Sequence, residues 1–120
     1  MNTTQTIHGL DLSYVLVTDV PRAIAFYRDV MGLEVSDIDE QGRGAEFTLA
    51  DGQTFCVWSE GQSKTGAGVF FAVKNIHEAI DEMRARGLEV SPAEEYPGCF
   101  MAFASDPDGN GFGIHQLKEQ

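Results

Sequence analysis

The sequence is poor in basic residues, in cysteine and in long hydrophobic runs. Its 8 Lys and Arg against 19 Asp and Glu give a formal net charge of −11, which disfavours nucleic acid and anionic membrane surfaces as partners. Two cysteines without a CxxC pair form no disulfide framework. The start, MNTTQTIHGL, lacks the features of a signal peptide, and no apolar run approaches transmembrane length. We therefore expect a cytoplasmic protein with reduced thiols, no nucleic-acid partner and no membrane association.

An internal repeat runs through the 120 residues, which we expect to form one domain (1–120). The stretch LSYVLVTDVPRAIAFYRDVMGLEV at 12–35 aligns with GVFFAVKNIHEAIDEMRARGLEV at 68–90. Further along, DGQTF of the first copy matches DGNGF of the second. The repeat predicts two similar modules, at about 10–60 and 67–117, joined by a polar linker at about 60–66.

Each module reads as a strand, a helix and three further strands. The β-branched, apolar run at 12–17 predicts the first strand. Asp19 then precedes a helix with Pro21 in its first turn, and Gly32 and Gly87 end the two helices. The other strands are expected at residues 33–38, 44–50, 54–59, 69–73, 88–91, 100–105 and 111–117.

Two motifs accompany this repeat: D-V-x-x-A-x-x-F-Y-x-D-x-x-G-L from Asp19 to Leu33, and D-P-D-G-N from Asp106 to Asn110. With the two βαβββ modules, they resemble the vicinal oxygen chelate superfamily over about residues 10–117. That superfamily includes glyoxalase I, bleomycin-resistance proteins, fosfomycin-resistance enzymes and extradiol dioxygenases. The resemblance implies an α+β fold in which eight strands form an incomplete barrel around a central cavity, with the helices outside. It implies no particular reaction, because function depends on the site.

In the metal-dependent members, four strand positions hold a divalent ion. The resemblance places them at Leu12, Cys56, Gly68 and Gly113, of which only Cys56 carries a donor. A Zn, Ni, Mn or Fe site of this class needs imidazole and carboxylate ligands. We therefore expect no metal and no other cofactor.

A shift of two residues along a strand keeps the side chain on the same face. From those four positions it leads to Tyr14, Trp58, Phe70 and His115, which with Cys56 are the predicted ligand-binding residues. Three aromatic rings and an imidazole are typical of a small-molecule pocket, and suit a planar or cationic ligand. The alternative is that these side chains fill the barrel as core.

Other candidate residues carry weaker signals. His8 is expected in the tail upstream of the first strand, and His77 at the start of the second helix, with a surface or capping role. The face on which Glu46 lies is not fixed by the sequence. Cys56 is expected to be an inert buried thiol rather than a reactive one, and Cys99 to lie in the loop before the seventh strand.

Two functions follow from the resemblance. The first is a metal-free protein of the bleomycin-resistance type that binds a small aromatic or cationic organic molecule in the barrel cavity and catalyses nothing. Because the groove of those proteins forms between two subunits, a homodimer is implied. The second is a glyoxalase-type lyase or isomerase with a displaced site that uses His115 and Glu46, with Cys56 or Cys99.

Overall fold

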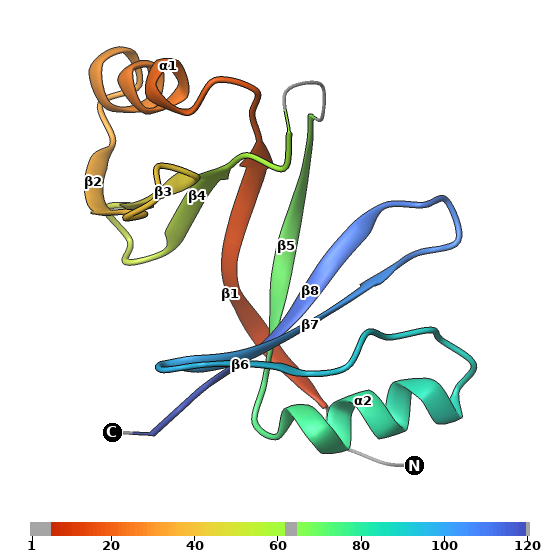
Figure 1. The fold of residues 1–120 in the computed structure, drawn as a ribbon. Helices are drawn as coiled ribbons and strands as arrows, with labels where there is room; N and C mark the ends of the chain where they lie inside the picture. The colour runs from red at the N-terminus through yellow and green to blue at the C-terminus, as the bar shows by residue number, and fades with distance from the viewer. Residues whose placement is uncertain (1–5, 62–64, 120) are drawn as a thin grey trace. The chain divides into compact units, whose positions relative to one another are not determined.

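The computed structural model describes residues 6–61 and 65–119. Both modules run strand, helix, strand, strand, strand (Figure 1), which confirms the α+β class and the βαβββ repeat. The elements are β1 (Ile7–Leu16), α1 (Val20–Ala25), the π-helical turn η1 (Phe26–Val30), β2 (Glu34–Ile38), β3 (Gly44–Thr48), β4 (Thr54–Trp58), β5 (Gly66–Val73), α2 (Ile76–Ala85), β6 (Glu94–Tyr96), β7 (Cys99–Ser105) and β8 (Gly111–Leu117).

The strands of the two modules pair in the same way. In the first module β1 runs parallel to β4, and β3 is antiparallel to both β4 and β2, which gives the order β2-β3-β4-β1. In the second module β5 runs parallel to β8, and β7 is antiparallel to both β8 and β6, which gives the order β5-β8-β7-β6. The internal repeat of the sequence is therefore a repeat of topology.

The chain forms two compact units whose boundary lies inside two strands. We call Leu12–Gly68 the N-terminal unit, and residues 6–11 together with 69–119 the C-terminal unit. The first residues of β1 thus belong with the strands of the second module. This assignment matters for the site, because it brings Asp11 into the C-terminal unit.

In the N-terminal unit α1 begins at a capped end. Asp19 is extended and its Oδ1 accepts a hydrogen bond from the Arg22 backbone N–H at 3.0 Å, with Pro21 in the first turn. The helix continues as the η1 turn and ends at Gly32, whose φ of 76° suits glycine. The predicted helix signals are therefore confirmed. The buried residues of α1, Val20 and Ile24, pack in one hydrophobic cluster with Ala45, Phe47 and Val57.

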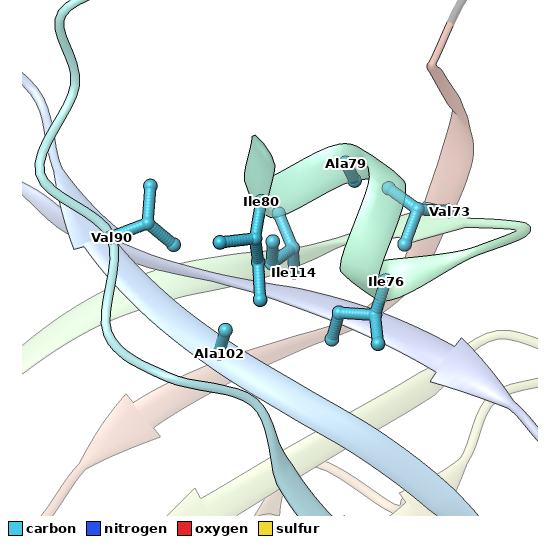
Figure 2. Close-up of a cluster of buried hydrophobic side chains, with 7 residues drawn as sticks. All are labelled: Val73, Ile76, Ala79, Ile80, Val90, Ala102 and Ile114. Atoms are coloured by element: carbon cyan, nitrogen blue, oxygen red, sulfur yellow. The ribbon is translucent and has the colours of Figure 1, made fainter. Parts of the chain in front are cut away.

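In the C-terminal unit α2 covers one face of the sheet, and Figure 2 shows its residues directed at those of the strands. Asn75 caps this helix by accepting from the Glu78 backbone N–H at 3.0 Å, and Gly87 with φ 95° follows its end. The buried cluster comprises Val73, Ile76, Ala79, Ile80, Val90, Ala102 and Ile114. Burial of this apolar surface against the strands holds the helix in place.

The strand predicted at 88–91 is wrong, because the corresponding strand β6 lies at Glu94–Tyr96. Ser91 pairs with Phe103 through its own side chain: its Oγ accepts from the Phe103 N–H at 2.8 Å, while its N–H donates to the Phe103 carbonyl at 2.9 Å. Pro92 follows and has no N–H to donate. Regular pairing therefore begins only at Glu94, opposite Met101.

The prediction for His8 is also wrong. It lies inside β1, which begins at Ile7 rather than at Leu12, and its side chain is exposed. The early start of β1 was not signalled, because HGLD lacks the β-branched residues of the stretch after it. The remaining strands agree with their predicted positions to within a few residues.

Candidate functional site

Strand register defines two faces of each sheet, because side chains alternate along a strand. In the C-terminal unit Ile114 and its neighbour Ala102 face α2, so the other face carries His115, opposite Met101. We call this second face, in either unit, the helix-distal face. In the C-terminal unit it also carries the cross-strand row Phe70, Gly113 and Phe103.

In the N-terminal unit the helix-distal face carries two such rows. Phe47 and Val57 are fully buried against α1, so their neighbours along the strands point away from it. One row runs Tyr14, Cys56 and Glu46 across β1, β4 and β3, and the next runs Leu16, Trp58 and Gly44. The register thus fixes the facing of Glu46, which the sequence left open: it lies beside Cys56.

Phe70 is 8% exposed and lies over Gly113. A Cβ added at Gly113 would have three ring atoms of Phe70 within 2.9 Å, so only glycine leaves room for the ring. The Phe70 ring also makes T-shaped contacts with the rings of Phe103 and His115, with ring centres 5.6 and 6.0 Å apart. These contacts build an aromatic surface at Gly113, one of the positions at which the sequence resemblance places a metal ligand.

Tyr14 lies over Gly68 in the same manner. A Cβ at Gly68 would have three atoms of the Tyr14 side chain within 2.8 Å. Burial, and then the negative charge of Glu60, raise the pKa of the Tyr14 phenol. The hydroxyl is therefore neutral at physiological pH and is able both to donate and to accept a hydrogen bond.

The four positions at which the sequence resemblance places metal ligands do not suit a metal. Leu12, Gly68 and Gly113 carry no donor atom. Burial raises the pKa of the Cys56 thiol to about 12, with a smaller contribution from the charge of Glu46, and the protonated thiol is a poor ligand because metals bind thiolate. Across the part of the chain that the structure describes, no group of three or more His, Cys, Asp and Glu side chains is placed to hold a metal ion.

Trp58 stacks with a cation of its own unit. The guanidinium carbon of Arg43 lies 5.2 Å from the centre of the Trp58 ring, within the range of a cation–π interaction. Both oxygens of Asp39 accept hydrogen bonds from Arg43, at 3.0 and 3.3 Å, and these bonds lower the pKa of Asp39. Trp58 is also packed over Gly44, so its ring position is set by the strand beside it.

His115 is 6% exposed and pairs with a residue that the sequence analysis did not consider. Its Nδ1 lies 2.6 Å from Oδ2 of Asp11. The Asp11 side chain is itself only 21% exposed, so the two groups form a largely buried carboxylate–imidazole pair. They are 104 positions apart in the sequence, and no local pattern could have joined them. Only the repeat of the two modules indicated that the first and last strands of the chain belong to one sheet.

The other candidates are peripheral to these faces. His77 is the second residue of α2, where its exposed ring meets the edge of Phe100 at 5.7 Å. Cys99 begins β7 rather than lying in the loop before it. In the DPDGN motif the Oδ1 of Asp106 accepts from the backbone N–H groups of Asp108 and Asn110, at 2.9 and 2.8 Å. The motif is thus a tight turn, as predicted, and not a metal loop.

Among the helices of residues 6–61 and 65–119, none has the length and apolar character needed to span a bilayer.

Comparison with known proteins gives a family and a fold. The profile of the Glyoxalase/Bleomycin resistance protein/Dioxygenase superfamily matches residues 9–114. A sequence search of curated proteins gives no match. Among solved structures, methylmalonyl-CoA epimerase from Mycobacterium tuberculosis is similar with a TM-score of 0.76 and 16% identity, over 99% of this chain and 94% of that one.

Two further structures show the same fold. A glyoxalase/bleomycin resistance protein/dioxygenase superfamily member from Vibrio splendidus has a TM-score of 0.66 and 20% identity, over 88% of this chain and 96% of that one. A variant of homoprotocatechuate 2,3-dioxygenase from Brevibacterium fuscum has a TM-score of 0.73 and 18% identity. The match covers 94% of this chain but only 33% of the dioxygenase chain. At these identities the likeness establishes the fold alone.

Proposed function

Because the chain belongs to the glyoxalase/bleomycin resistance protein/dioxygenase superfamily, whose shared fold does not fix a reaction, we propose that it binds a small organic molecule without a metal. The ligand is aromatic or cationic in part. Each helix-distal face carries predicted contact residues of its own: Tyr14, Cys56 and Trp58 in the N-terminal unit, and Phe70 and His115 in the C-terminal unit. The expected cytoplasmic location and homodimer belong to the same proposal.

One observation carries this proposal: rings cover the positions at which metal-dependent relatives carry ligands. Phe70 lies over Gly113 and Tyr14 over Gly68, so these positions offer apolar π surface in place of imidazole and carboxylate donors. Such surfaces bind planar groups by stacking and cations through the ring quadrupole. The Arg43 guanidinium on Trp58 is an internal example of the second mode.

The alternative is a lyase or isomerase with a displaced site that uses His115 and Glu46. The Asp11–His115 pair favours it, because a carboxylate that orients an imidazole is a common arrangement for a general base. Glu46 is exposed and adjoins Cys56 in the N-terminal unit, which gives a second carboxylate for acid–base chemistry.

Trp58 is the only tryptophan of the chain, so its fluorescence reports on ligands at that residue. We expect benzyltrimethylammonium to quench Trp58 emission in a saturable way, and uncharged neopentylbenzene of the same shape to bind more weakly. Arg43→Gln should strengthen the cation response, because it removes the cation already stacked on the ring. Glu40→Gln, at an exposed position, is the matched control.

Two results would contradict the proposal. The first is emission that stays unchanged for both probes and for a wider set of planar and cationic molecules. The second is stoichiometric Zn or Ni in protein purified without chelator, together with turnover of a hemithioacetal that is lost in His115→Ala. The second result would instead establish a metal-dependent enzyme of the glyoxalase kind.

A further inference from the structure

Asp11 and His115 form the most deeply buried pair of ionisable side chains among the described ion pairs of the chain. The side chain of His115 is 8% exposed and that of Asp11 is 21% exposed, whereas each of the other described ion pairs has at least one partner that is 40% exposed or more. Burial of polar groups is costly unless they are hydrogen-bonded. The short contact between Nδ1 and Oδ2, 2.6 Å, meets that requirement for one ring nitrogen.

The position of the imidazole ring is fixed from several sides. Phe70 meets it edge-on, with the ring planes at 87° and the centres 6.0 Å apart. Ala72 and Met101 flank His115 in register on the two neighbouring strands. All these residues belong to the C-terminal unit, so the arrangement is complete within one compact body. A turn of the ring would break the contact between Nδ1 and Asp11.

The second ring nitrogen, Nε2, is left available. Nδ1 makes the one hydrogen bond of the His115 side chain found among the described residues. Within the same residues no fully buried side-chain nitrogen or oxygen lacks a hydrogen-bond partner. Because Nε2 has no hydrogen-bond partner in residues 6–61 and 65–119, it is not fully buried. In the neutral imidazole the nitrogen that carries no proton is an acceptor.

We infer that Asp11 is a positioning residue, which holds His115 with its proton on Nδ1 and presents Nε2 as an acceptor to a ligand. A carboxylate only accepts hydrogen bonds, so the nitrogen that faces it must donate, and this choice sets the tautomer of the ring. The residues around His115 on this face are apolar: Phe70, Phe103 and Met101. The matching ligand is planar and carries an N–H or O–H donor at the edge of its ring system.

This inference rests on the proposed binding function, which it makes more specific. It assigns to one atom, Nε2, the hydrogen bond that selects among planar ligands. It predicts that a ligand without the donor loses affinity, because Nε2 would then be desolvated without a partner. Indole and 1-methylindole serve as probes, since methylation of the ring nitrogen removes the N–H donor and leaves the planar ring system.

The tautomer is tested without any ligand. Long-range ¹H–¹⁵N spectra of the full-length protein, recorded where the ¹⁵N shifts show a neutral imidazole, should give His115 as the Nδ1–H form. Asp11→Ala should shift this signal toward a mixture of tautomers or the Nε2–H form, while Asp108→Asn at an exposed turn should leave it unchanged. A His115 that carries its proton on Nε2 in the wild type, or that keeps its tautomer in a folded Asp11→Ala variant, would overturn the assignment.

Binding is tested in the same spectra. Indole should shift the His115 Nε2 resonance, and 1-methylindole should bind about two- to tenfold more weakly, as expected for one lost hydrogen bond. In Asp11→Ala the affinities for indole and 1-methylindole should become more similar, because Nε2 is then no longer held as the acceptor. Equal binding of the two probes, or binding of neither, would overturn the ligand class. These outcomes do not by themselves contradict the proposed function. That function is tested separately, by the response of Trp58 fluorescence to cationic probes.

Discussion

The two modules place an aromatic ring at the same register position and pack it in different places. Tyr14 lies opposite Cys56, and Phe70 lies opposite Gly113. Gly113 leaves room, so the Phe70 ring covers its own cross-strand partner. Cys56 carries a thiol, and the Tyr14 ring lies over Gly68 instead. One residue on the last strand of each module therefore decides where the aromatic surface forms.

The two modules differ just as strongly two residues further along β4 and β8, at the next position on the same face. The second module has His115, buried and paired with the carboxylate of Asp11. The first module has Trp58, which is partly exposed and stacks with the Arg43 guanidinium. Arg43 in turn donates a hydrogen bond to Asp39. The repeated topology thus carries a buried carboxylate–imidazole pair in one unit and a ring stacked with a guanidinium in the other. Duplication has preserved the topology while the helix-distal faces have acquired separate chemistry.

Removal of the Phe70 side chain is expected to have the largest effect on stability. Phe70→Ala deletes a buried ring that contacts Phe103, His115 and Gly113, so it should cost about 3–5 kcal/mol of unfolding free energy. Tyr14→Ala, at the same position of the first module, should cost less because Tyr14 is only partly buried. Urea denaturation of both variants measures the difference. Equal losses would mean that the two rings contribute alike and that the comparison fails.

The second prediction compares the glycines beneath the two rings, Gly113 under Phe70 and Gly68 under Tyr14. Gly113→Ala forces a Cβ into the confined Phe70 ring and should cost about 1–3 kcal/mol. Gly68→Ala meets the far end of the less buried Tyr14 side chain, which is able to move away. The lower entropy of the unfolded chain, worth about 0.4–1 kcal/mol for Gly to Ala, then offsets much of the cost.

A double-mutant cycle sharpens this test. In the Phe70→Ala background the added Cβ has space, so Gly113→Ala should lose most of its cost, and the two changes should be clearly non-additive. Thermal or urea unfolding of the four proteins gives the coupling. Additive free energies would show that Phe70 is not the neighbour that requires glycine at position 113.

Much of the fold was predictable from local signals. Asp19 and Gly32 bracket the first helix, and the matching stretches predicted the repeat of topology that the structure has. The strand at 88–91 was not predictable, because Val90 is apolar and β-branched but is buried in the core as part of a loop. Local propensity cannot distinguish a buried loop residue from a strand residue when tertiary packing decides.

The candidate site was predictable only in part. The two-residue periodicity of strands led to Phe70 and His115, which share the helix-distal face of one unit. Asp11 was missed because it precedes the β-branched stretch and acts through a partner 104 positions away. The facing of Glu46 needed the burial of Phe47 beside it to be known. Pairing across a sheet is set by long-range register, which a single sequence does not contain.

Cys56, the residue that separates the first module from the second, is tested by its reactivity rather than by stability at neutral pH. With a thiol pKa of about 12, set mainly by burial, Cys56 is protonated at neutral pH. In a Cys99→Ser variant, iodoacetamide at pH 9 should modify the folded protein about two to three orders of magnitude more slowly than the urea-unfolded protein. Because the pKa is higher in the folded state than the usual 9.0, the folded protein retains a proton that the unfolded chain loses, so the contribution of Cys56 to stability falls as the pH rises above 9.

Glu46→Gln separates the charge contribution from burial. It removes the neighbouring negative charge, so it should lower the Cys56 pKa and speed alkylation of the folded protein, whereas Glu40→Gln should not. Rapid alkylation of folded wild-type protein at pH 7–8 would mean a thiolate at this position. Cys56 would then be able to act as a metal ligand or nucleophile, which would favour the catalytic alternative.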